Sequence, residues 1–136
     1  MEAPSVYGTI AADHLRAPRN LGKLNEADGV GTVEDEASQT MLTMYVKLGA
    51  HPDDQPVIVE ARFRAFGCGG CIVTGSVATE LVKGHPLAYG ETLDGAAIEL
   101  ALDHGLPANQ RYCAELAARA LRIACQTASI RASQPS

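Results

Sequence analysis

The chain has 136 residues, of which 46% are hydrophobic and 20% are charged. This length fits one compact domain spanning residues 1–136, and the composition excludes wholesale disorder. The formal net charge of -5 argues against a surface for nucleic acids or anionic membranes. No apolar run approaches the roughly 20 residues needed to cross a bilayer, and the first residues lack the pattern of a secretory signal. We therefore expect a cytoplasmic, reducing environment, in which the four cysteines are thiols or metal ligands.

The N-terminal segment has the pattern of a short helix. Pro4-Ser5 indicates its start, and Ala11 and Leu15 share one face. Pro18 ends this helix, because a proline disfavours helical geometry in the residue before it.

Three β-like segments follow. The first is short and spans 30–33, the second alternates loosely over 40–48, and the third, 57–66, is rich in β-branched and aromatic residues. The stretch 49–56 contains two prolines and two aspartates, which indicates a turn and an antiparallel pairing of the second and third strands.

Helical spacing dominates the rest of the chain. It predicts a helix from about Ile72 to Val82, a second over 93–102 and a long alanine-rich helix from Arg111 to about Ile130, before a flexible tail over about 131–136. Strands followed by helices indicate an α+β domain with helices on one face of a small antiparallel sheet. The side chains expected in its common core are those of Phe63, Ile72, Leu81, Leu116 and Ile123.

The residues best suited to metal binding or nucleophilic chemistry are the cysteines. Cys68 and Cys71 follow a strand and begin a helix, where free N–H groups and the helix dipole favour the thiolate. Cys113 lies at the start of the last helix, so the three sulfurs could form one site. Cys125 lies about 18 Å further along that helix at 1.5 Å per residue, so we expect it to be a buried apolar residue outside the site.

A C-x-x-C pair alone leaves other interpretations open. Two small residues packed at a helix start would give the same pattern. A thioredoxin-like redox pair also follows a strand, but the segment before Cys68 has the pattern of an antiparallel hairpin. His14 on the first helix is expected to be a surface or boundary residue and not a ligand.

Several motifs together are similar to those of the U-type iron–sulfur cluster scaffold proteins, the IscU/NifU N-terminal-domain group. They are His14-Leu15-Arg16-Ala17-Pro18-Arg19-Asn20-Leu21-Gly22, Ala61-Arg62-Phe63-Arg64-Ala65-Phe66-Gly67-Cys68-Gly69, Thr79-Glu80-Leu81-Val82-Lys83-Gly84 and Cys113-Ala114-Glu115-Leu116-Ala117. The resemblance extends from about Val6 to Ile130 and implies a three-stranded antiparallel sheet covered by helices.

The resemblance also implies a cluster site that this chain has altered. Typical members assemble a [2Fe–2S] cluster on three cysteines with an assisting aspartate or histidine. Cys68 and Cys113 match the second and third of those cysteines. Ser38 stands at the first cysteine position, Thr40 at the aspartate position and Tyr112 at the histidine position.

Cys71 is an additional thiol, because the family commonly carries a small residue at that position. It could supply the third sulfur, but the fourth ligand would then be a hydroxyl, water, a distant residue or a partner. Such a site would bind a cluster weakly or depend on a partner, because iron–sulfur clusters favour four thiolates or thiolate–imidazole sets.

Two functions follow from this pattern. The first is a non-enzymatic scaffold or carrier that binds iron, zinc or a cluster through Cys68, Cys71 and Cys113, with weakened or lost assembly. Its expected partners are a cysteine desulfurase or an iron–sulfur client protein. The alternative is an accessory interaction subunit of an iron–sulfur-rich redox complex, such as a respiratory dehydrogenase, with no bound cofactor. Neither interpretation includes nucleic-acid binding or direct membrane insertion.

Overall fold

The computed structural model describes residues 6–49 and 55–133. Three strands form one antiparallel sheet in the order β1 (Gly29–Asp35), β2 (Thr40–Gly49) and β3 (Val57–Phe66). This pairing confirms the expected antiparallel hairpin, although residues 50–54 of its connection lie outside the described residues. In the part of the chain that the structure describes, no helix is sufficiently long and apolar to cross a membrane.

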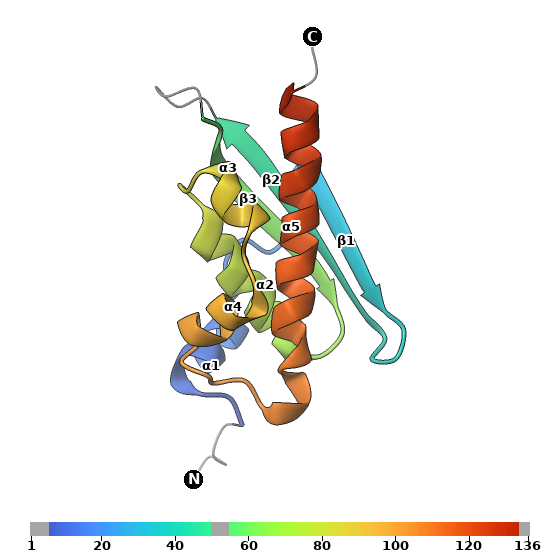
Figure 1. Cartoon of the computed structure of the whole chain (residues 1–136). Coiled ribbons are helices and arrows are strands. Elements are labelled where there is room, and N and C mark those ends of the chain that lie inside the picture. The colour runs from blue at the N-terminus through green and yellow to red at the C-terminus, as the bar shows by residue number, and fades with distance from the viewer. Residues whose placement is uncertain (1–5, 50–54, 134–136) are drawn as a thin grey trace.

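The helices lie on one face of the sheet. They are α1 (Thr9–Arg16), α2 (Gly69–Val82), α3 (Leu87–Glu91), α4 (Gly95–Ala101) and α5 (Tyr112–Ser133), with a 3-10 turn at Ala108–Gln110. Figure 1 shows α5 running along the sheet, where it contacts β1 and β2, while α2 contacts β3 and α5. The predicted α+β class, with helices on one face of a three-stranded antiparallel sheet, is therefore confirmed.

Several element boundaries differ from the expected ones. Helix α1 begins at Thr9 after the N-cap Gly8, later than Pro4-Ser5, which lie outside the described residues. The helix expected over 93–102 is α4, which begins later because Asp94 caps it by accepting from the Ala97 N–H at 2.9 Å, and the short helix α3 before it was not expected. Helix α5 continues to Ser133, so its last turn includes residues that we expected in a flexible tail.

Close contact between α5 and β1 depends on small residues. A Cβ added at Gly31 would lie 2.2 Å from the Ala120 carbonyl oxygen and 2.6 Å from the Ala124 nitrogen. The alanines on this face of α5, Ala120, Ala124 and Ala128, have no exposed surface. The helix backbone therefore packs directly on the strand, which explains how a chain with few aromatic residues builds a dense core.

The expected core is correct for Phe63 and Leu116 and wrong for Ile123. Phe63 is fully buried and Leu116 is 9% exposed, whereas Ile123 is 37% exposed. Ile72 and Leu81 are half-buried and pack against the core. Because the alanine stripe centres the buried face of α5 on Ala120 and Ala124, the side chain of Ile123 falls at its outer edge.

Candidate metal centre

A glycine turn joins β3 to α2 and brings the first two cysteines to one end of the sheet. Gly67 has φ +143°, a conformation that side-chain-bearing residues rarely adopt. A Cβ there would also lie 3.1 Å from Thr40 Oγ1 and 3.2 Å from Cys71 Sγ. Gly67 therefore allows the chain to reverse and the hydroxyl of Thr40 to approach the cysteine sulfurs.

Two helix N-termini meet at this turn. Cys68 is the N-cap of α2 and Cys71 lies in its first turn, while Cys113 is the second residue of α5. Polar contacts fix the segment that enters α5. Tyr7 Oη donates to Gln110 Oε1 at 2.6 Å, and the Gly95 N–H donates to Glu115 Oε2 at 3.0 Å.

The sulfurs of these three cysteines form a compact triangle. Cys68 Sγ lies 3.9 Å from Cys71 Sγ and 3.5 Å from Cys113 Sγ, and the latter two are 3.4 Å apart. A tetrahedral ion with metal–sulfur bonds of about 2.3 Å places its ligand sulfurs about 3.8 Å apart. The triangle therefore has the size of one face of a tetrahedral thiolate site, and the predicted convergence of the three sulfurs is confirmed.

The three cysteines of the triangle differ in their exposure to solvent and in the pKa values of their thiols. Cys71 and Cys113 are fully buried and Cys68 is half-buried. Hydrogen bonding by Cys113, and then by Cys68 and Thr40, lowers the pKa of Cys71 to about 6, against the effect of burial. The hydrogen bond to Cys71 and burial raise the pKa of Cys113 above its usual range. These opposite shifts favour an ionised Cys71 beside a protonated Cys113, and a bound cation would deprotonate the thiols that bind it.

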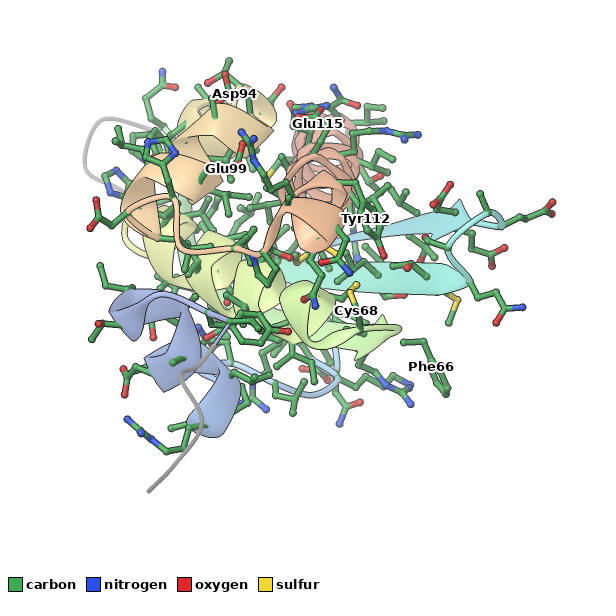
Figure 2. All side chains as sticks on the ribbon, turned by 90° about the horizontal axis from the view of Figure 1, so that it is seen from below. Phe66, Cys68, Asp94, Glu99, Tyr112 and Glu115 are labelled. Atoms are coloured by element: carbon green, nitrogen blue, oxygen red, sulfur yellow. The ribbon has the colours of Figure 1, made fainter. Side chains whose placement is uncertain are left out.

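Hydroxyl groups border the sulfur triangle. Tyr112 Oη lies 3.6 Å from Cys68 Sγ and 3.4 Å from Thr40 Oγ1. Ser38 Oγ lies 2.8 Å from Thr40 Oγ1 and 2.5 Å from Asp35 Oδ2. In Figure 2, which views this end of the molecule, Cys68 and Tyr112 lie close together and Phe66 projects outward. The three substituted positions of the resemblance thus form one network beside the cysteines.

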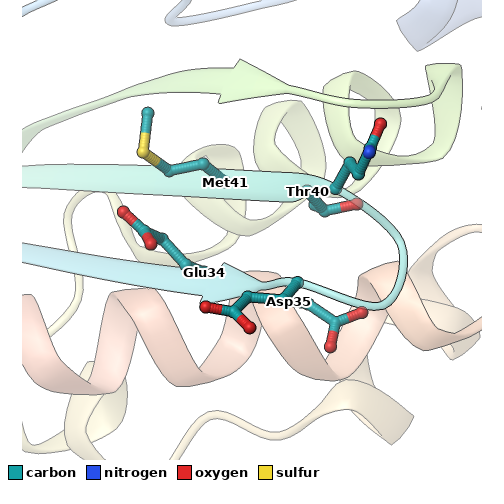
Figure 3. A pocket seen from close by; sticks show the side chains of 6 residues that line it. Glu34, Asp35, Thr40 and Met41 are labelled. Atoms are coloured by element: carbon teal, nitrogen blue, oxygen red, sulfur yellow. The ribbon is translucent and has the colours of Figure 1, made fainter.

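Asp35 is a residue of this network that the sequence did not single out. It ends β1 and accepts from Ser38 three residues later, a spacing that short polar turns commonly use. A pocket of about 310 Å³ lies at the same β1–β2 turn, lined by Glu34, Asp35, Glu36, Gln39, Thr40 and Met41 (Figure 3). Its carboxylates give the pocket a negative potential.

Cys125 and His14 lie apart from this triangle. Cys125 is fully buried, a Cβ at Gly90 would meet its sulfur, and burial raises its pKa to about 12. Its expected role as an apolar packing residue fits this environment. His14 is half-buried, and its Nδ1 lies 2.7 Å from Ser76 Oγ, so it is a boundary residue as expected.

Comparisons with known proteins agree with this fold. The sequence profile of the NifU-like N terminal domain matches residues 6–134. The iron-sulfur cluster assembly scaffold protein IscU 1 of Archaeoglobus fulgidus is 39% identical over 119 residues, which cover 88% of this chain and 74% of that protein. The IscU scaffold protein of Azotobacter vinelandii is 33% identical over 121 residues, covering 87% and 90% of the two chains.

A solved structure supports the fold independently. The N-terminal part of a nitrogen-fixing NifU-like protein from Brucella abortus aligns with a TM-score of 0.67 and 15% identity, covering 92% of this chain and 95% of that one. The two structures are similar in the arrangement of their helices and strands. From the profile match and the IscU relatives together, we conclude that the chain belongs to the NifU-like N-terminal domain family.

Proposed function

We propose that this protein is a divergent iron–sulfur cluster scaffold or carrier that binds iron, zinc or a cluster through Cys68, Cys71 and Cys113. The observation that supports this most strongly is the sulfur triangle, whose sides of 3.4 to 3.9 Å suit one tetrahedral ion. The two relatives described above are named iron-sulfur cluster assembly scaffold proteins, which supports the same function. The metal or cluster is cargo, so the protein is not an enzyme in this proposal.

The same triangle argues for weakened assembly of a two-iron cluster. A [2Fe–2S] cluster takes four protein ligands, two on each iron. Three sulfurs packed against one another can surround one ion, but a cluster needs some of them to move apart. The hydroxyls of Ser38, Thr40 and Tyr112 at the border are poor ligands for soft metals, because they remain protonated near neutral pH.

Exposed apolar side chains beside the site support exchange of cargo with a protein partner. Phe66, two residues before Cys68, is 70% exposed, and Met41, its partner across the strands, is 36% exposed. Together with Tyr45 and Arg64 they line a pocket of about 160 Å³ on the sheet face. We propose a cysteine desulfurase or an iron–sulfur client protein as the partner that covers this surface, in the cytoplasm.

Anaerobic reconstitution tests this proposal. The reduced chain is supplied with iron, sulfide and a desulfurase, beside a three-cysteine scaffold of the family. We expect bound iron that depends on Cys68, Cys71 and Cys113, with a cluster that forms more slowly than on the reference scaffold. A metal-free, stably folded chain under all these conditions would contradict the proposal.

The second candidate is an accessory interaction subunit of an iron–sulfur-rich redox complex. Two features favour it. Hydroxyl groups replace the expected ligands at Ser38, Thr40 and Tyr112, while the fold keeps an exposed surface around Phe66 on which a protein could dock. Tight co-purification with a large redox complex, without bound metal on this chain, is the result that would select it.

A further inference from the structure

The three thiols of the site differ in their access to solvent. Cys68 is half-buried, next to the exposed Gly67, whereas Cys71 and Cys113 have no exposed surface. A reagent in solution therefore meets the sulfur of Cys68 first. Any bond formed there lies within 3.9 Å of two further thiols.

Cys113 Sγ lies nearer to Cys68 Sγ, at 3.5 Å against 3.9 Å for Cys71 Sγ, but the chain connection favours Cys71 as the partner of Cys68. Both lie at the N-terminus of α2, where the Cys71 N–H donates to the Cys68 carbonyl at 3.0 Å. The covalent loop that would join them contains only Gly69 and Gly70, so its closure costs little entropy. Cys113 lies in α5, so a disulfide bond between Cys68 and Cys113 would close a much longer loop that contains α2, α3 and α4.

From this arrangement we propose that Cys68 and Cys71 form a reversible dithiol–disulfide couple, and that disulfide formation releases the metal cargo. The couple itself rests on the thiol geometry, while cargo release rests on the function proposed above. Disulfide formation removes two of the three thiolates. Cys113 alone would then remain, and one thiolate cannot hold a tetrahedral ion.

The exchange balances with a small disulfide such as oxidised glutathione as the oxidant. The Cys68 thiolate attacks one glutathione sulfur, forming a mixed disulfide and releasing one glutathione thiol. Cys71 then attacks Cys68 Sγ, breaking the mixed disulfide and releasing the second. Two protein thiols are oxidised, one glutathione disulfide is reduced to two thiols, and the protons lost by the cysteines go to the leaving thiolates.

The first test uses the reduced, metal-free full chain treated with oxidised glutathione. We expect a loss of two thiols, a mass decrease of about 2 Da for the two hydrogens and a peptide that joins Cys68 to Cys71. Cys113→Ser should retain this product and Cys125→Ser should behave as the unmodified chain. Cys71→Ser should slow the second thiol loss at least about tenfold, with circular dichroism confirming that each variant is folded. A peptide joining Cys68 to Cys113, or glutathione that persists on Cys68 of the unmodified chain, would overturn the couple.

The second test loads the reduced chain with zinc before adding oxidised glutathione. A colorimetric chelator should detect zinc release in step with thiol loss, and dithiothreitol with fresh zinc should restore binding. Stoichiometric zinc that stays bound while the disulfide forms overturns the release step. A chain that forms the disulfide but never binds zinc contradicts the proposed function and the release step, while the couple stands.

Discussion

Ser38, Thr40 and Tyr112 carry oxygen at the border of the sulfur triangle, and under the proposed function this chemistry sets which metals the site prefers. Thr40 is 3% exposed, and its hydroxyl lies near both Tyr112 Oη and Ser38 Oγ. These neutral groups complete the hydrogen bonding of the site without adding charge. The cysteine sulfurs therefore remain the groups in the buried part of the site that can carry negative charge.

Restoring the family ligands should strengthen cluster binding. In the triple variant Ser38→Cys, Thr40→Asp and Tyr112→His, a thiolate, a carboxylate and an imidazole replace three neutral hydroxyls. We expect a reconstituted [2Fe–2S] cluster to persist about tenfold longer or more than on the unmodified chain, since ligand-shell changes commonly alter metal retention by this much. The decay of visible absorbance in a chelator measures it.

The metal-free triple variant provides the matching control. Asp at position 40 would place a carboxylate at a buried position, which destabilises the fold when no cation is near. The variant should therefore unfold at lower denaturant than the unmodified chain without metal and recover with metal. Equal cluster decay in the two chains, with both folded, would show that the border residues do not limit retention.

Helix α5 links the core to the site, because it carries Cys113 at one end and the alanine stripe along its length. Leu116→Ala should lower the free energy of unfolding by about 2–5 kcal/mol, as large-to-small substitutions in a core generally do. Ile123→Ala on the same helix is the matched comparison. Its side chain is 37% exposed, so we expect a smaller loss of about 1 kcal/mol. Urea denaturation measures both, and a similar loss at the two positions would contradict the assigned inner face.

Helix α1 should make stability sensitive to mild acid through His14. Burial, followed by the charge of Arg19, lowers the pKa of His14 below the ordinary histidine value of about 6.5. The folded state thus binds fewer protons than the unfolded chain, so its stability is full above about pH 6.5 and falls as the pH drops through the folded pKa. We expect a loss below about 1 kcal/mol, since the ring is partly exposed to solvent.

Denaturation at pH 7.5 and 5.5 measures this effect, with His14→Gln as the control that removes it. Asp13 and Glu60 titrate in a lower range. Hydrogen bonding to Arg19 lowers the pKa of Asp13, and hydrogen bonding to Lys83 lowers that of Glu60. Their contributions disappear at more acidic pH, so an unchanged slope between pH 7.5 and 5.5 in His14→Gln would exclude His14 as the cause.

On the scale of the whole molecule, the hydrophobic periodicity and the family motifs were sufficient to predict the fold class. Apolar alternation indicated β2, the β-branched and aromatic content indicated β3, and Cys68 and Cys71 were expected at the start of a helix, where α2 begins. The outward position of Ile123 was not predictable in this way. Helical spacing gives a face, but the contact of Gly31 with the α5 backbone sets its centre, and that contact joins segments distant in the sequence.

The site was predictable to a similar extent. Cys68, Cys71 and Cys113 begin helices, and helix starts at one end of a sheet can converge. The sequence also excluded Cys125 by its distance along α5. The sulfur separations and the link from Asp35 to Ser38 depend on how the β1–β2 turn packs against α5, which no local pattern encodes.

In the proposed function, the sulfurs of Cys68, Cys71 and Cys113 hold the metal cargo together. X-ray absorption of anaerobically prepared protein loaded with zinc or iron tests it most directly. We predict one ion per chain with three sulfur ligands at about 2.3 Å, lost in Cys68→Ser, Cys71→Ser and Cys113→Ser and retained in Cys125→Ser. A bound ion whose sulfur shell is unchanged by Cys71→Ser, or a folded chain that binds no metal, would contradict the claim.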